Sequence, residues 1–238
     1  MDEVVTYQDV SDRLPDLPFR VRQVLSGPHE NFHYLVADPR SGDAVLVDPA
    51  FHVDRLVAEA RAAGLAVRGA LFTHGHWDHI GGAPDVARLG VPWVAAHRAL
   101  AGHGRLAEAE AAGAQVVLLD DGDVVPVGDV PVRALHTPGH RPESTCYLAG
   151  RDDERRVLLG GDCLFVGSCG RTDFPGGDTD EMFASMERLR GLDGDIVVLP
   201  GHHYAEATAR SLAEERIHNP ALAVADRAAF GRLPFLHG

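Results

Sequence analysis

Short apolar runs alternate with segments of helical periodicity along most of the chain. Apolar residues recur at helical spacing over 53–63 and Gly64 follows them, which predicts a helix with a C-terminal stop. Further helices are predicted at 98–112 and 179–190. The remaining runs predict strands at 34–37, 44–47, 67–72, 91–95, 116–119, 130–135, 144–148, 157–159 and 196–199. This interleaving predicts an α/β protein with a single domain over 1–238, whose two similar halves meet near residue 120.

Four of the predicted strands run directly into loops that carry His or Asp beside Gly or Pro. These loops are 73–79, 136–140, 160–162 and 200–203. In layered α/β folds, strand ends gather at a common edge, and loops on that rigid scaffold carry the chemistry. We therefore expect the four loops to form one cluster of metal-binding or catalytic side chains.

The first loop holds the densest motif of the chain, HxHxDH. Its His74, His76, Asp78 and His79 offer three imidazoles and a carboxylate, which are ligands of zinc and iron. In extended backbone the first two His point the same way, and a turn into a helix at Asp78 would carry the last two ligands to a neighbouring position. One segment could thus serve two metals. A merely polar turn is a poorer interpretation, because ordering four such side chains is costly.

The other three loops add His140, Asp162 and His202 as candidates. Taken singly, each is equally well interpreted as a hydrogen-bonded loop His or a solvated carboxylate. Their shared position after strands strengthens all three together. His136 and His203 stand nearby as competing candidates.

Composition narrows the class of function. The 22 basic residues, all of them Arg, against 35 acidic ones give a net charge of −13, which argues against a nucleic-acid partner. The absence of Lys excludes Schiff-base chemistry and the phosphate-binding P-loop. The 3 Cys, an odd number, are expected as reduced thiols. No apolar run approaches the roughly 18 residues of a membrane span, and the first residues lack signal-peptide features, so we expect a cytoplasmic protein without a membrane partner.

The HxHxDH, HTPGH, strand-GD and PGHHY motifs together resemble the metallo-β-lactamase superfamily. The resemblance implies a four-layer αββα sandwich with a metal site at one edge of its two sheets. It also implies two divalent metal ions, zinc in the first place, with iron or a mixed iron–zinc pair as alternatives. By motif, the ligands would be His74, His76 and His140 for one ion, Asp78, His79 and His202 for the other, and Asp162 between them. His136 and His203 match no ligand position.

A finer resemblance, carried by the blocks 161–178 and 215–220, is to the glyoxalase II-like branch. It implies a hydrolase that cleaves a thioester or related ester of a small thiol conjugate through a metal-bound hydroxide. Asp78 and Asp162 would orient the nucleophile, and Arg171 and Tyr204 would contact the substrate. Two departures argue against glutathione itself as the carrier thiol: Asp173 stands where a Tyr is usual, and the chain ends before that branch's C-terminal helical substrate domain.

The persulfide dioxygenases of the same superfamily also resemble this chain and give the main alternative. They imply one non-haem iron held by His74, His140 and Asp162, two His and one carboxylate. Trp77 and the segment 218–220 favour the hydrolase. A catalytically idle binding protein would have lost ligands, a nuclease would show a basic patch, and β-lactam hydrolysis is expected only as a side activity.

Overall fold

Two mixed β-sheets face each other in the computed structural model, which describes residues 6–10, 14 and 16–237. Among these residues the first sheet has seven strands in chain order, β1 (Thr6–Asp9), β2 (Arg20–Ser26), β3 (Asn31–Ala37), β4 (Asp43–Val47), β5 (Ala66–Phe72), β6 (Trp93–His97) and β7 (Gln115–Leu119). The pairs from β1 to β4 are antiparallel, whereas those from β4 to β7 are parallel. Parallel neighbours need crossover connections, and these place helices on the sheet's outer face.

The second sheet follows the first in the sequence. Within the described part of the chain it has six strands, in the order β15 (Arg210–Ser211), β14 (Val197–Pro200), β11 (Val157–Gly161), β10 (Thr145–Ala149), β9 (Val130–His136) and β8 (Val124–Val127). β11 and β14 are parallel, and the other neighbouring strands are antiparallel. A small hairpin of β12 (Leu164–Phe165) and β13 (Ser168–Cys169) leaves the end of β11.

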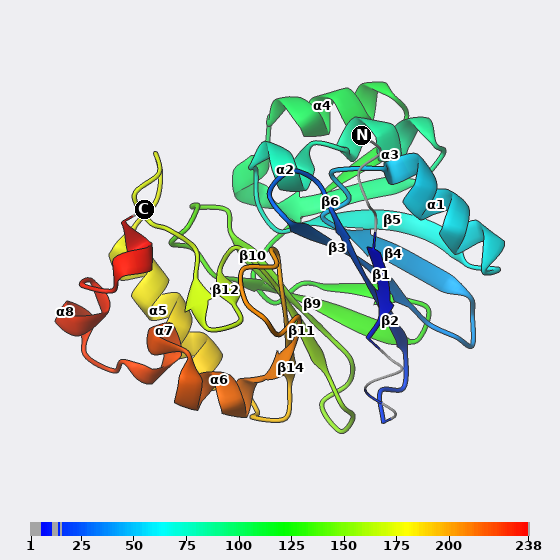
Figure 1. The fold of residues 1–238 in the computed structure, drawn as a ribbon. Helices are drawn as coiled ribbons and strands as arrows, with labels where there is room; N and C mark the ends of the chain where they lie inside the picture. The colour runs from blue at the N-terminus through cyan, green and yellow to red at the C-terminus, as the bar shows by residue number, and fades with distance from the viewer. Residues whose placement is uncertain (1–5, 11–13, 15, 238) are drawn as a thin grey trace.

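Helices cover the outer faces of both sheets (Figure 1). Those that accompany the first sheet are α1 (Val53–Ala62), α2 (Trp77–Ile80), α3 (Ala83–Arg88) and α4 (Gly104–Ala111). Those that accompany the second are α5 (Thr179–Arg190), α6 (Leu212–His218), α7 (Pro220–Ala223) and α8 (Arg227–Phe230). Short 3-10 turns span Arg98–Leu100 and Pro234–Leu236. The order helix, sheet, sheet, helix confirms the predicted αββα sandwich.

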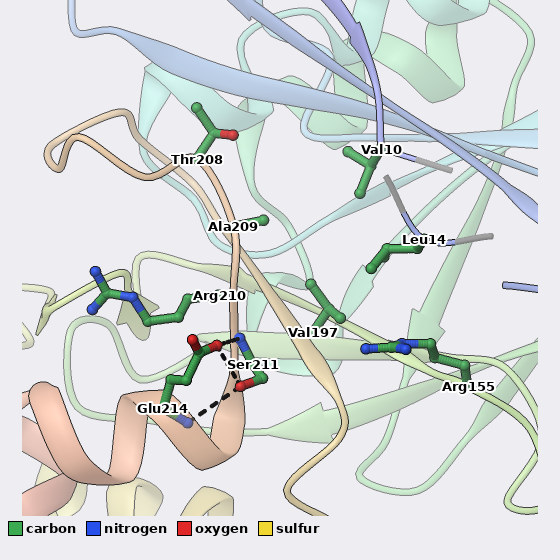
Figure 2. A pocket seen from close by; sticks show the side chains of 9 residues that line it. All are labelled: Val10, Leu14, Arg155, Val197, Thr208, Ala209, Arg210, Ser211 and Glu214. Carbon is green, nitrogen blue, oxygen red and sulfur yellow. Dashed lines mark hydrogen bonds between the residues drawn. The ribbon is translucent and has the colours of Figure 1, made fainter. Parts of the chain in front are cut away.

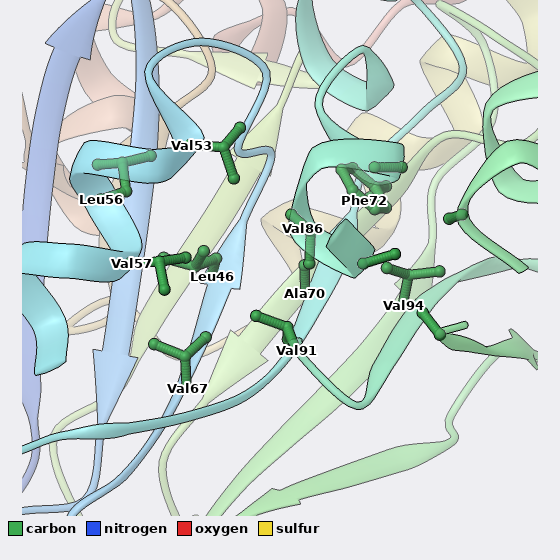
Figure 3. Close-up of a cluster of buried hydrophobic side chains, with 14 of the residues drawn as sticks. Leu46, Val53, Leu56, Val57, Val67, Ala70, Phe72, Val86, Val91 and Val94 are labelled. Atoms are coloured by element: carbon green, nitrogen blue, oxygen red, sulfur yellow. The ribbon is translucent and has the colours of Figure 1, made fainter. Parts of the chain in front are cut away.

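Successive side chains of a strand enter different cores, as the two-residue period of a strand requires. Leu46 of β4 packs in the core beneath the first group of helices, whereas Val45 and Val47 pack between the sheets. In β10, Tyr147 lies between the sheets and Leu148 faces the second group of helices. Figure 3 shows Leu46 against the apolar face of α1. Each such buried Leu or Val stabilises the fold by about 1.5–3 kcal/mol.

Each predicted strand is present, but the helix predicted at 98–112 is not continuous. After the turn Arg98–Leu100, Gly102 adopts a left-handed φ of 80°, which interrupts the helix. His103 then caps the N-terminus of α4, and its side chain accepts a hydrogen bond from the backbone N–H of Arg105. Across the described residues, every helix is too short or too polar to cross a lipid bilayer.

The two sheets are joined at the rim where the four loops gather. The backbone N–H of Thr145 in β10 donates to the carbonyl of Thr73 after β5, at 2.9 Å. Phe32 of β3 donates to the carbonyl of Gly201 after β14, at 2.8 Å. These bonds fix the loops of one sheet against those of the other, so the rim is a defined surface.

Candidate metal centre

One group of possible ligands combines His74, His76, His140 and Asp162, whose ligand atoms all lie within 4.8 Å of one another. Nδ1 of His76 lies 3.0 Å from Nε2 of His74 and 3.0 Å from Nε2 of His140. His74, His140 and Asp162 are buried, and His76 is half-buried. Three imidazole nitrogens therefore converge beside a carboxylate where the loops of the two sheets meet.

A second group combines Asp78, His79 and His202, again with all ligand atoms within 4.8 Å. Nε2 of His79 faces Nε2 of His202 at 3.1 Å. Oδ2 of Asp78 lies 3.9 Å from the first of these nitrogens and 3.7 Å from the second. Two nitrogens and one carboxylate oxygen thus surround a second point.

Asp162 faces both groups with different oxygens. Its Oδ1 lies 3.2 Å from Nε2 of His79 and 3.3 Å from Nε2 of His202. Its Oδ2 lies 3.5 Å from Nε2 of His140 and 3.9 Å from Nε2 of His74. Oδ1 is buried and has no hydrogen-bond partner. A buried carboxylate oxygen without a donor, facing imidazole nitrogens, fits a divalent cation.

The division into two groups follows from a change of backbone conformation inside the first loop. His76 is extended, with φ −67° and ψ 144°, and α2 begins at the next residue. The ligands before and after that point therefore leave the backbone in different directions, as the sequence predicts. Gly161, which precedes Asp162, adopts φ +50°, and a Cβ there would lie 2.6 Å from the side chain of Thr73. Only Gly allows the two strand ends to approach this closely.

The outward nitrogens of the imidazoles are fixed by protein oxygens. Four rings direct Nδ1 at an acceptor: His74 at Thr73 Oγ1 (3.0 Å), His79 at Asp48 Oδ2 (2.9 Å), His140 at the carbonyl of Arg171 (2.7 Å) and His202 at the carbonyl of His29 (2.8 Å). Donation of Nδ1–H outward leaves the Nε2 lone pair facing the cluster. The ring of His76 has the opposite orientation, so that its Nδ1, and not its Nε2, faces the cluster. The rings are held in the tautomers that metal ligation requires.

Asp48 combines a turn conformation with a contact that orients one of the candidate ligands. It has a left-handed φ of 49°, as a turn residue, and it also orients a ligand. Its Oδ1 accepts from the backbone N–H of Thr73 at 2.7 Å, and its Oδ2 accepts from Thr73 Oγ1 at 2.6 Å and lies against His79. The carbonyl of Asp48 lies 2.5 Å from Nδ1 of His33. Asp48 thus connects the end of β4 to the first loop.

Asn31 orients the candidate ligand Asp78, and no motif in the sequence predicts this role. Its Nδ2 donates to Oδ2 of Asp78 at 3.1 Å and to the carbonyl of Asp78 at 3.0 Å. Asn31 is buried, and its backbone forms a bridge with His202. No local pattern marks it, because its partner lies 47 residues away.

The electrostatics favour neutral imidazoles in the first group, whereas the pKa values of His79 and His202 in the second group are raised beside the ionised Asp162. Burial lowers the pKa of His74, and it lowers the pKa of His76 to about 4. Burial alone would raise the pKa of Asp162, but neighbouring imidazoles, His79 foremost, hold it well below its usual range. Although burial opposes it, Asp162 and Asp48 raise the pKa of His79. The carboxylates of Asp48 and Asp162 thus stabilise a positive charge on His79, and they would stabilise a metal cation for the same reason.

A cleft of about 450 Å³ opens over both groups, a size typical of small-molecule sites. Besides ligand residues, it is lined by His29, Trp77, Phe165, Gly170, Arg171, Phe174 and Tyr204. The two predicted substrate contacts, Arg171 and Tyr204, therefore both face it. Tyr204 stacks on His202 with 4.8 Å between ring centroids, and burial raises the pKa of its hydroxyl to about 12.

A second hollow, of about 230 Å³, lies beside β14 and β15 (Figure 2). None of its lining residues is a candidate ligand. Its carboxylate, Glu214, is bonded to Ser211 in the capping box that begins α6. Of these two hollows, only the cleft is lined by candidate ligands.

Neither the two competing His nor the Cys that follows Asp162 belongs to a ligand group. His136 stacks on His97 with ring centroids 4.0 Å apart, and His203 packs against Phe32 at 5.4 Å. Cys163, which follows Asp162, is buried in the core beneath the second group of helices.

Comparison with known proteins places these features in a family. A model described as the metallo-beta-lactamase superfamily matches residues 27–202, which include all seven candidate ligands. A hydroxyacylglutathione hydrolase from Polaromonas sp. is 36% identical over 192 residues, covering 79% of this chain and 68% of that protein. The human mitochondrial persulfide dioxygenase ETHE1 is 30% identical over 208 residues, covering 86% of this chain and 76% of that protein. The solved structure of TTHA1623 in a di-iron-bound form is 33% identical with a TM-score of 0.65, covering 83% of this chain and 98% of that one.

Proposed function

This chain belongs to the metallo-β-lactamase superfamily, and on that premise we propose that it is a metal-dependent hydrolase acting on the thioester, or a related ester, of a small thiol conjugate. The observation that carries the proposal is the position of Asp162. One of its oxygens faces His79 and His202, while the other faces His140 and His74. A carboxylate shared in this way suits a pair of cations better than a single one.

We infer two divalent cations, with zinc as the first choice and iron or an iron–zinc pair as alternatives. His74, His76 and His140 would hold one, Asp78, His79 and His202 the other, and Asp162 both. The chemistry that such a pair supplies is the acidification of a water molecule and the polarisation of a carbonyl group. The imidazole-rich ligand set with one shared carboxylate suits zinc and iron.

The carboxylates of Asp78 and Asp162 would accept the hydrogen bonds of the attacking water and so orient it. Asn31 holds Asp78, and Asp48 holds His79, so neither side chain has to reorganise during the reaction. Arg171 and Tyr204 would contact the conjugate from the walls of the cleft. A thiol has a pKa of about 8.5, so a thiolate leaves with little protonation, and the site needs no strong general acid.

The test combines elemental analysis with a hydrolysis assay on the purified chain. We expect about two divalent ions per chain and thioester cleavage that is equally fast under nitrogen and in air. Loss of cleavage on chelation and its return on adding zinc would support the proposal. A chain that holds two ions but cleaves no thioester or ester would overturn it.

The persulfide dioxygenase activity is the second candidate. It is favoured by the relative ETHE1 and by the presence of His74, His140 and Asp162 in one ligand group. It requires a single iron and molecular oxygen. One iron per chain together with oxygen uptake that depends on a persulfide would establish this activity in place of the hydrolase.

A further inference from the structure

Aromatic side chains stand exposed around the cleft. Among the described residues, the exposed large apolar side chains include Trp77, Phe174 and Tyr204, with exposed fractions of 55%, 38% and 57%, and all three line the cleft. The others, Leu118, Val124 and Ile217, lie on β7, β8 and α6. Apolar surface gathered around a polar site marks a place where a ligand binds.

The three rings are positioned by the ligand groups themselves. Phe174 stands edge-on to His76 with ring centroids 5.5 Å apart. Tyr204 lies parallel to His202, at an angle of 8°. Trp77 follows His76 at the start of α2. Aromatic walls therefore border both ligand groups.

Outside the two proposed metal positions, the walls of this cleft carry little positive charge. Arg171 is the one Arg among the described residues that line it. Its Nε and Nη2 donate to the two carboxylate oxygens of Asp173, both at 2.8 Å, and its guanidinium lies 4.4 Å from the ring centroid of Phe174. The pair is close to neutral, and the net charge of −13 repels anionic ligands at longer range. The walls thus lack an unpaired Arg for the carboxylates of glutathione.

We propose, on the premise of the thioesterase activity above, that the substrates are thioesters of an uncharged thiol whose acyl group is aromatic or bulky and apolar. The acyl group packs against Phe174 and Trp77, since offset and edge contacts between aromatic rings are favourable. Hydrolysis breaks the C–S bond and forms a C–O bond from water. It releases the corresponding carboxylate, the free thiol and one proton.

A panel of four thioesters separates this inference from the proposed function. The acyl group is acetyl or phenylacetyl on the neutral thiol N-acetylcysteamine, and phenylacetyl or lactoyl on glutathione. We expect kcat/KM for the phenylacetyl ester of N-acetylcysteamine to exceed those of the other three by about tenfold. A preference for S-lactoylglutathione would overturn the inference and leave the thioesterase intact. Cleavage of none of the four would overturn the proposed function.

Variants locate the preference in the aromatic walls. We expect Phe174→Ala and Trp77→Ala to lower kcat/KM for the phenylacetyl ester of N-acetylcysteamine about five- to tenfold, and for the acetyl ester less than about twofold. Ile217→Ala removes another exposed apolar side chain, from α6, and should leave kcat/KM for both esters unchanged. Calorimetry with the non-hydrolysable thioether S-(2-phenylethyl)-N-acetylcysteamine gives a readout independent of turnover, and Phe174→Ala should weaken its binding. Equal losses for both esters, or unchanged thioether binding, would show that the walls do not select the acyl group.

Discussion

One amide of Asn31 donates hydrogen bonds to both the side-chain Oδ2 and the backbone carbonyl of Asp78, at 3.1 and 3.0 Å. The two residues come from β3 and α2, 47 positions apart. Asn31 therefore fixes the carboxylate and the helix that carries it at the same time.

Replacement of Asn31 should weaken the second metal position selectively. In Asn31→Ala the carboxylate of Asp78 loses its donor, and affinity for the second ion should fall by about 10- to 100-fold, as is typical when a residue that orients a ligand is removed. The measurement is a competitive chelator titration that resolves the two ions. Gln23→Ala is the matched control, because Gln23 is also a buried amide with two acceptors but contacts Tyr34 and Thr208. Equal weakening of both ions by Asn31→Ala would point to a general loss of structure instead.

Removal of Asp162 should release both ions together. Asp162→Ala takes away the oxygens that face both ligand groups, and we expect a loss of hydrolysis greater than about 100-fold along with the metal. Elemental analysis after desalting checks this, with Asp152→Ala, whose side chain is 90% exposed, as the control. If Asp162→Ala retains two ions per chain, the shared-ligand assignment is wrong.

The buried His33 should make stability depend on pH. Burial lowers its pKa from 6.5 to about 4, so between these values the unfolded chain binds a proton that the folded chain does not. This contribution is complete above pH 6.5 and is lost as the pH falls towards 4. From pH 7 to pH 5 the chain should lose about 1–2 kcal/mol more unfolding free energy than His33→Gln. Urea unfolding of both proteins with a chelator present measures the difference, and identical pH profiles would contradict it.

Removal of the Arg171 side chain should affect substrate binding more than metal binding. The carbonyl of Arg171 accepts from His140, and that contact survives in Arg171→Ala. The lost guanidinium covers Phe174 and lines the cleft, so KM should rise several-fold, on the order of 1 kcal/mol, while kcat falls less. Steady-state kinetics with parallel metal analysis checks this, and the control is Arg151→Ala, in the loop after β10, because Arg151 does not line the cleft. An unchanged KM would remove Arg171 from the substrate contacts.

Most of the fold follows from local patterns, and its gaps have physical causes. The strands that enclose the core have strongly apolar runs, and these predict β3 to β7, β9 to β11 and β14. β12, β13 and β15 each have two residues, too few for any periodicity. β2 has polar residues at buried or half-buried positions, such as Gln23, whose bonds to distant partners no local rule anticipates.

The candidate site likewise contains residues that the sequence predicts and others that it does not. His74, His76, Asp78 and His79 share one short motif, and the other three candidates follow strands, so the sequence marks all seven. No motif predicts the role of Asn31, because that role depends on a contact between β3 and a residue of α2 that is distant in the sequence. Arg171 was predicted as a side chain that contacts substrate, and the structure adds the role of its carbonyl beside His140, which any residue type would supply.

The candidate ligands come from both halves of the sandwich. His79 lies in α2 beside the first sheet, and His202 follows β14 of the second sheet, 123 residues later. An ion held by both closes a loop of that length, so it would act on the unfolded chain as a reversible cross-link comparable to a long-range disulfide. The four ligands of the first motif also leave the ribosome long before His202 is made. The second position would therefore be complete only after His202 has been made, which ties metal loading to the docking of the two sheets.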